Sequence, residues 1–247
     1  MPGITINQTS FEADLVIFDK DGTLLDFEAT WLGIIRALIE AIGRRTPMTP
    51  GLAERIQRYL GIDLAGESIH GFGPLAMGTD VETEVIMTGC LYREGLRWDE
   101  AGAIVRAACA EVFGGQVRLD HMTAAPGALD LLAELKRRGI LTAVATNDNA
   151  HDAGRDMRAI GAAPFIDFVA GADSVKRPKP APDMIELICA KLKVDPARAI
   201  MVGDAVSDTI AGRQAGCGLT VGISGFVPRE LIAAHCDVVI EGLDEIS

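Results

Sequence analysis

The stretch from residue 15 to residue 23 reads LVIFDKDGT, so four apolar residues lead directly into two carboxylates, Asp19 and Asp21. A short continuous apolar run is typical of a strand that is buried on both faces of a parallel sheet. Open α/β sheets bind ligands at the carboxyl ends of such strands. The stretch therefore predicts the first strand of an α/β core, with an acidic site at its end.

Similar apolar runs recur at residues 141–145, 199–202 and 219–221, each followed by small or polar residues. Between them, apolar residues three or four positions apart predict helices at residues 128–138, 183–193 and 208–215. Strands that alternate with helices form parallel sheets. We therefore expect one parallel α/β core made by residues 1–26 and 121–247.

The segment from residue 27 to residue 120 departs from this alternation. It has helical patterns at residues 28–44, 51–60, 81–94 and 99–113 and no convincing buried strand. It contains nine arginines and no lysine, whereas all six lysines of the chain lie outside it. We interpret residues 27–120 as a helical domain inserted after the first strand, with a long irregular loop at residues 66–78.

Composition and charge narrow the possible partners. The 247 residues are 49% hydrophobic and 23% charged, which is typical of a globular protein. The formal net charge of −12 argues against nucleic acid and anionic membranes as partners. The N-terminus lacks the pattern of a signal peptide, and no apolar stretch is long enough to span a bilayer. We expect a cytoplasmic protein that is a monomer or a homodimer.

Further polar residues follow two of the predicted strands. Thr146 and Asn147 come directly after residues 141–145, and Asp204 follows residues 199–202 with Asp208 four positions later. Each pair alone has an ordinary explanation, because Thr-Asn is common in turns and Asp208 suits the start of a helix. Together with Asp19 and Asp21, however, they predict four carboxylates, a hydroxyl and free backbone amides at one edge of the sheet.

Cations for this edge come from a loop that reads KRPKPAP at residues 176–182 and presents Lys176 and Lys179. Carboxylates cannot converge without compensating positive charge, which a lysine and a divalent metal ion supply. The five cysteines and four histidines are scattered without metal-ligand spacing. Oxygen ligands alone therefore predict Mg²⁺ rather than zinc, and a phosphate group held beside it for attack by a carboxylate.

These residues occur in an order that resembles the haloacid dehalogenase superfamily: Asp19-x-Asp21-Gly22-Thr23, then Thr146, Lys179, and Gly203-Asp204 with Asp208. The resemblance covers the whole chain and implies a Rossmann-like parallel sheet core. The place of the insertion is similar to that of the helical cap in the phosphoglycolate phosphatase and β-phosphoglucomutase branch. Residues 27–120 would then be a cap domain that closes over the substrate.

The resemblance also implies catalytic roles. Asp19 would be the nucleophile that forms an aspartyl-phosphate, and Asp21 would protonate the leaving oxygen and then activate water. Thr146 and the Asn147 amide would bind the transferring phosphoryl group, and Lys179 would neutralise both that group and Asp19.

A metal set follows from the same resemblance. Mg²⁺ would be bound by Asp19, by the main-chain carbonyl of Asp21 and by Asp204, and Asp208 would support the metal or its waters.

Two lysines depart from a simple match to the family's motifs. Lys20 occupies a position that is more often apolar in this branch, so it either alters the local charge or points away from the site. Lys176 competes with Lys179 for the cationic role, and the Lys-Pro-x-Pro context favours Lys179.

The function expected from this resemblance is that of a phosphoric monoester hydrolase acting on a small phosphate ester of the phosphoglycolate or sugar-phosphate type. Asp21 argues against dehalogenation, and the lack of lysine in residues 27–120 argues against phosphonate hydrolysis. Two alternatives stay open: a phosphomutase of the β-phosphoglucomutase type, and a non-catalytic phosphate-binding regulator. Candidate substrate contacts in the insertion are Trp31, His70 and Phe72, although Trp31 is more typical of a domain core.

Overall fold

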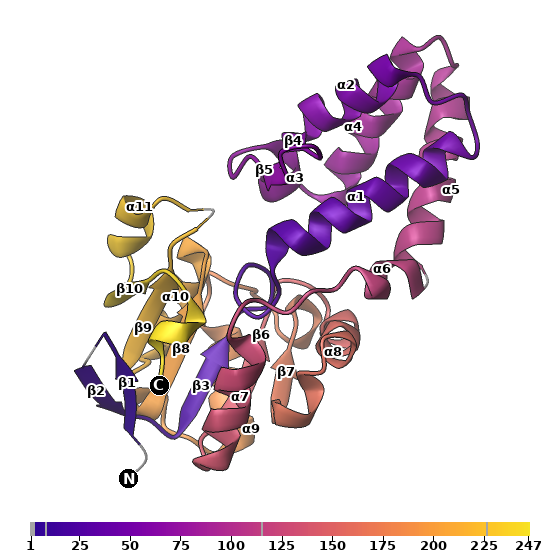
Figure 1. Cartoon of the computed structure of the whole chain (residues 1–247). Helices are drawn as coiled ribbons and strands as arrows, with labels where there is room; N and C mark the ends of the chain where they lie inside the picture. Colours follow the sequence, from indigo (N-terminus) through magenta and orange to yellow (C-terminus); the bar gives the residue numbers. More distant parts are fainter. Residues whose placement is uncertain (1–2, 8, 115, 226) are drawn as a thin grey trace. The chain divides into compact units, whose positions relative to one another are not determined.

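A computed structural model of the chain describes residues 3–7, 9–114, 116–225 and 227–247. The chain divides into two compact units, one made by Met1–Phe27 with Thr123–Ser247 and the other by Glu28–Met122 (Figure 1). The first unit contains an α/β sheet, and the second is mainly helical.

The α/β unit is built on a six-stranded sheet in which every neighbouring pair is parallel. The predicted fold class is therefore confirmed. The strand order is β10-β9-β8-β3-β6-β7. The strands are β3 (Leu15–Phe18), β6 (Leu141–Ala145), β7 (Phe168–Ala170), β8 (Ala199–Gly203), β9 (Leu219–Ile223) and β10 (Val238–Ile240).

Helices cover the sheet because its strands are apolar on both faces. Leu15 and Ile17 of β3 pack in one buried cluster with residues of α9 and α10, whereas Val16 and Phe18 are buried on the opposite face. The helices of this unit are α7 (Ala128–Arg137), α8 (Ala150–Ala159), α9 (Asp183–Leu192), α10 (Val206–Ala215) and α11 (Arg229–Ala233). Short 3₁₀ turns lie at Ala163–Phe165, Ala172–Ser174, Pro196–Arg198 and Leu243–Glu245.

Two strands that the sequence pattern did not predict precede the strand that carries Asp19. The strand that carries Asp19 is the third of the chain, because an antiparallel pair, β1 (Gly3–Ile6) and β2 (Thr9–Glu12), precedes it. β2 is largely exposed, so it lacks the buried apolar run that predicted β3, β6, β8 and β9. β3 is nevertheless the first strand of the parallel sheet.

The helical unit contains the four long helices that the periodicity predicts. They are α1 (Phe27–Gly43), α2 (Pro50–Leu60), α4 (Asp80–Arg93) and α5 (Trp98–Phe113), and α6 (Gln116–Asp120) follows them. Local signals set their limits: the Thr49 side chain accepts a hydrogen bond from the Leu52 N–H, and Gly61 ends α2 with a φ of 74°.

The predicted irregular loop at residues 66–78 has some regular structure. β5 (Ser68–Ile69) pairs with β4 (Ile62–Asp63) as a two-residue antiparallel ladder, and α3 (Pro74–Met77) follows. These elements are too short to produce a periodic pattern, which explains why the sequence did not reveal them.

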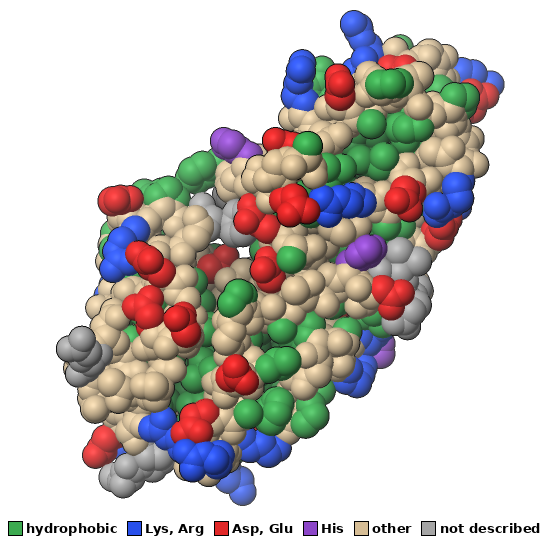
Figure 2. All heavy atoms as spheres, viewed as in Figure 1, with side chains coloured by type: hydrophobic (Ala, Val, Ile, Leu, Met, Phe, Trp, Pro, Cys, Tyr) green, Lys and Arg blue, Asp and Glu red, His purple; other side chains and the backbone are tan. Residues whose placement is uncertain are grey.

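On the face drawn in Figure 2, acidic and basic side chains are interspersed. Among the helices of the described residues, none combines the length and the apolar character that crossing a membrane requires.

Candidate active site

The three central strands of the sheet bring the predicted motifs to one edge. β3 lies between β8 and β6, with Phe18 opposite both Val202 and Val144. The Asp19 N–H donates to the carbonyl of Val202 over 2.9 Å. Residues that follow these three strands therefore emerge side by side, as expected for the carboxyl edge of a parallel sheet.

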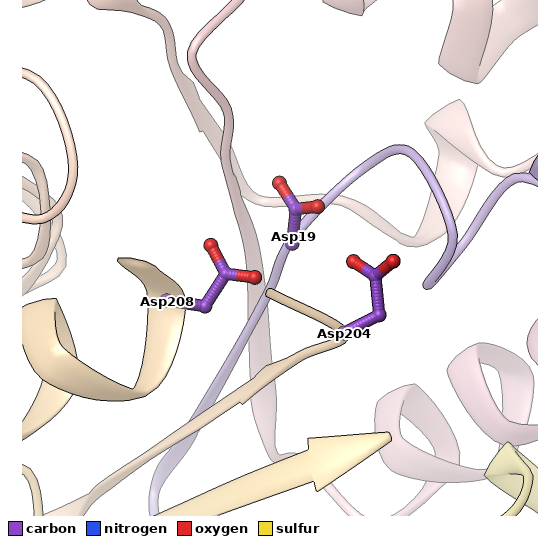
Figure 3. Close-up of side chains that lie close together, drawn as sticks. All are labelled: Asp19, Asp204 and Asp208. Atoms are coloured by element: carbon purple, nitrogen blue, oxygen red, sulfur yellow. The ribbon is translucent and has the colours of Figure 1, made fainter. Parts of the chain in front are cut away.

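Three carboxylates gather at this edge. Asp19 follows β3, Asp204 follows β8 and Asp208 lies in the first turn of α10 (Figure 3). One oxygen atom from each lies within 4.8 Å of the others, a spacing that one divalent cation can bridge with small side-chain shifts. A set of carboxylate oxygens alone fits a hard cation such as Mg²⁺.

Two glycines make room for these carboxylates. A Cβ at Gly22, where φ is +76°, would lie 2.1 Å from Oδ2 of Asp204. A Cβ at Gly203 would lie 2.2 Å from Oδ2 of Asp208. The predicted motifs therefore contain glycine next to aspartate because the neighbouring carboxylate fills the space of a side chain.

We expect Gly203→Ala to weaken Mg²⁺ binding by roughly tenfold or more, since the added methyl group displaces Asp208 from the cluster. Titration calorimetry with Mg²⁺ measures the change. Gly89→Ala is the matched control, because a Cβ at Gly89 meets no atom within 4 Å. Equal Mg²⁺ affinity for the two variants would show that Asp208 has no part in binding the metal.

Lys179 supplies the positive charge within the cluster. Its Nζ lies 2.6 Å from Oδ1 of Asp19 and 2.6 Å from Oδ1 of Asp208, and it donates to the carbonyl of Ala145 over 2.7 Å. Lys179 is buried, with 5% of its surface exposed, whereas Lys176 is exposed. The structure therefore brings Lys179 to the carboxylates, while Lys176 lies at the surface.

Burial and neighbouring negative charge together shift the pKa values of the cluster. Burial raises the pKa of Asp19 to about 6, a rise that Lys179 opposes and Asp208 increases. Burial, with the charges of Asp19 and Asp208, raises the pKa of Asp204 well above its usual range. Although burial acts to lower it, the pKa of Lys179 is raised by Asp19 and Asp208, so the lysine stays charged. A divalent cation here would favour the ionised carboxylates.

Asp21 lies apart from the three-carboxylate cluster and contacts Lys20. The Lys20 Nζ lies 2.9 Å from Oδ2 of Asp21, 2.7 Å from Oδ2 of Asp148 and 2.9 Å from Oδ2 of Asp156. Burial raises the pKa of Asp21 to about 6; Lys20 opposes the rise, whereas Asp148 and Asp19 increase it.

Asp148 and Asp156 were not predicted from the sequence. Lys20 itself was the available signal, because a lysine that is buried beside a strand needs acidic partners.

Thr146 and Asn147 follow β6 at the same edge. The buried Thr146 accepts a hydrogen bond at Oγ1 from the Asp148 N–H over 3.1 Å. The Asn147 side-chain amide donates to the main-chain carbonyl of Lys179 over 3.1 Å. Asn147 therefore helps to hold the lysine loop against the end of β6.

The three candidate substrate contacts lie in the helical unit. Trp31 packs against Phe113 with ring centroids 6.2 Å apart and is partly buried, as expected of a domain core. His70 and Phe72 are exposed and form an edge-to-face pair with centroids 6.4 Å apart.

Known proteins share both the sequence pattern and the fold of this chain. A family model described as haloacid dehalogenase-like hydrolase matches residues 13–216. The chain is 32% identical over 235 residues to a probable phosphatase, IndB, of Dickeya dadantii, covering 94% of this chain and 91% of that protein. It is 29% identical over 236 residues to a phosphoglycolate phosphatase of Neisseria meningitidis, with the same coverage of 94% and 91%.

Among solved structures, the fold is similar to that of a putative β-phosphoglucomutase from Thermotoga maritima. The TM-score is 0.67 at 23% identity, and the match covers 92% of this chain and 94% of that one. At 23% identity, this similarity shows that the two chains share a fold.

Proposed function

The chain belongs to the haloacid dehalogenase-like hydrolase family, and on that premise we propose that it is a Mg²⁺-dependent phosphatase of small phosphorylated metabolites. The protein is a phosphoric monoester hydrolase. We propose in addition that it uses Mg²⁺ and an aspartyl-phosphate intermediate, and that its substrate is of the phosphoglycolate or sugar-phosphate type. The observation that carries the proposal is the contact of Lys179 with both Asp19 and Asp208, beside Asp204.

In this proposal Asp19 is the nucleophile. One of its carboxylate oxygens forms a bond to phosphorus while the bond between phosphorus and the ester oxygen breaks, which gives an aspartyl-phosphate and an alcohol. Water then attacks phosphorus, phosphate leaves and the Asp19 carboxylate is regenerated. The Lys179 ammonium, 2.6 Å from Asp19, offsets negative charge that would otherwise repel the incoming phosphate.

Asp21 transfers the protons. It gives a proton to the ester oxygen as that oxygen leaves and later takes one from the attacking water. A pKa of about 6 suits both tasks near neutral pH, since the carboxyl group exchanges a proton readily there.

The phosphoryl group is held by Thr146 and the Asn147 amide. Thr146 is buried at the end of β6, beside the strand that carries Asp19. Lys179 completes this set of donors from its loop.

Asp19, Asp204 and the main-chain carbonyl of Asp21 would hold Mg²⁺, with Asp208 as support. The cation would polarise a phosphoryl oxygen and compensate the carboxylates. We propose that the helical unit is a cap that excludes water from the attack step. The predicted bounds of this unit are residues 27–120, and its contacts delimit it as Glu28–Met122.

We also assign the protein to the cytoplasm, as a monomer or a homodimer with no nucleic-acid or membrane partner. All five cysteines are free, which fits a reducing compartment. Light scattering of the purified protein tests the oligomeric state.

The proposal is tested by phosphate release from a panel that contains phosphoglycolate, sugar phosphates, nucleotides and an aryl phosphate. We expect release with Mg²⁺, its loss with EDTA and its return with excess Mg²⁺, because the acidic cluster needs a cation. Release that EDTA leaves unchanged would contradict the metal assignment. A folded protein that releases phosphate from no panel member would instead indicate a mutase or a phosphate-binding regulator.

A further inference from the structure

Lys20 is a buried cation that joins three parts of the α/β unit. Only 1% of its surface is exposed. Its Nζ contacts carboxylates from its own loop, from the loop after β6 and from α8, at Asp21, Asp148 and Asp156. The role proposed for Asp21 in proton transfer does not explain why Lys20 also contacts Asp148 and Asp156.

Residue 20 is held at both its backbone and its side chain. The Lys20 carbonyl accepts hydrogen bonds from the N–H groups of Leu24 and Leu25 at 3.0 and 2.9 Å. Its ammonium donates to Asp156, whose side chain is fully buried in α8. A buried ammonium is costly to move away from a buried carboxylate, so the contact with Asp156 holds Nζ in place.

This fixed ammonium restricts the neighbouring carboxylate. Asp21 retains 33% side-chain exposure, so packing alone leaves it room to adopt several rotamers. The contact with Lys20, 2.9 Å from Nζ to Oδ2 of Asp21, ties this carboxyl group to the fixed ammonium. The ion pair therefore limits the rotamers in which the carboxyl group can exchange a proton with a substrate.

We propose that Lys20 is a positioning residue that, through its contact with Oδ2, fixes the orientation of the Asp21 carboxyl group for proton transfer to the leaving oxygen. The proposal rests on the proposed function, because it concerns the proton donor of that reaction. Loss of Lys20 should therefore lower the rate strongly for substrates whose leaving oxygen needs a proton, and only slightly for substrates whose leaving oxygen does not.

The test compares two substrates of Lys20→Met, an alkyl phosphate and 2,4-dinitrophenyl phosphate. The alkoxide needs a proton as it leaves, whereas the dinitrophenolate is stable without one. We measure kcat/KM, which includes the departure of the leaving group but not the later attack by water. General acid catalysis contributes about 10²–10⁴-fold, so we expect a loss of roughly 10²-fold for the alkyl ester and under about threefold for the dinitrophenyl ester.

Two further variants separate positioning from folding. Lys20→Met removes an ammonium that contacts the buried Asp156, so the double variant Lys20→Met/Asp156→Asn, which removes both charges, is measured as well. Lys191→Met, at an exposed lysine of α9, is the matched control and should behave as wild type. Circular dichroism and thermal unfolding establish that each variant is folded.

A coupling measurement sharpens the assignment. In an Asp21→Asn background, Lys20→Met should cause little further loss with the alkyl ester, because the group that Lys20 positions is already absent. Equal losses for both esters, or full additivity of the two substitutions, would overturn the proposal. Failure of the wild-type protein to hydrolyse either ester would instead count against the proposed function, so the two failures are distinguishable.

Discussion

Asp19→Asn is expected to lower phosphate release by roughly 10⁴-fold or more, since the loss of a nucleophile removes the covalent step altogether. An amide oxygen is a poor nucleophile, and the substitution also removes one of the three clustered carboxylates. The fold should persist, because Lys179 keeps its contact with Asp208 and less negative charge is confined at the edge of the sheet.

The measurement is kcat with the best substrate of the panel, together with the unfolding temperature. Mass spectrometry must accompany it, since deamidation of the introduced asparagine restores aspartate and would simulate residual activity. A folded, undeamidated variant with activity near that of wild type would refute the assignment of Asp19 as nucleophile.

Lys179→Ala has the second-largest expected effect. Removing a preorganised donor from a site of developing charge costs about 10²–10³-fold in kcat. Lys179 also lies between Asp19 and Asp208, so its loss leaves two close carboxylates without their shared ammonium. We therefore expect a fall in kcat of that size and a greater dependence of the unfolding temperature on Mg²⁺.

Lys176→Ala is the matched control, because this lysine lies in the same loop but is exposed. Its activity should stay within about twofold of wild type, as is usual for an exposed side chain away from the chemistry. If Lys176→Ala lost more activity than Lys179→Ala, the cationic role would belong to Lys176.

Much of the fold could be predicted because its signals are local. β3 and β6 coincide with the predicted runs at residues 15–18 and 141–145, since strands buried on both faces are continuously apolar. β2, which is largely exposed, and the three-residue strands β7 and β10 were not identified, because no long apolar run marks them.

The residues of the candidate site that directly follow a strand could be predicted from the sequence. Asp19, Thr146 and Asp204 each follow a strand, and neighbouring parallel strands end at the same edge. The sequence by itself therefore determined the parallel core, the helical insertion and the set of residues at that edge.

Only the tertiary structure decided which charges meet. Lys176 and Lys179 are three positions apart in one loop, and packing buries just one of them between Asp19 and Asp208. Lys20 is paired with Asp156, which lies far along the chain in α8. The physical reason is that secondary structure follows from short-range patterns of apolar residues, whereas the partner of a buried charge depends on which distant segments pack together.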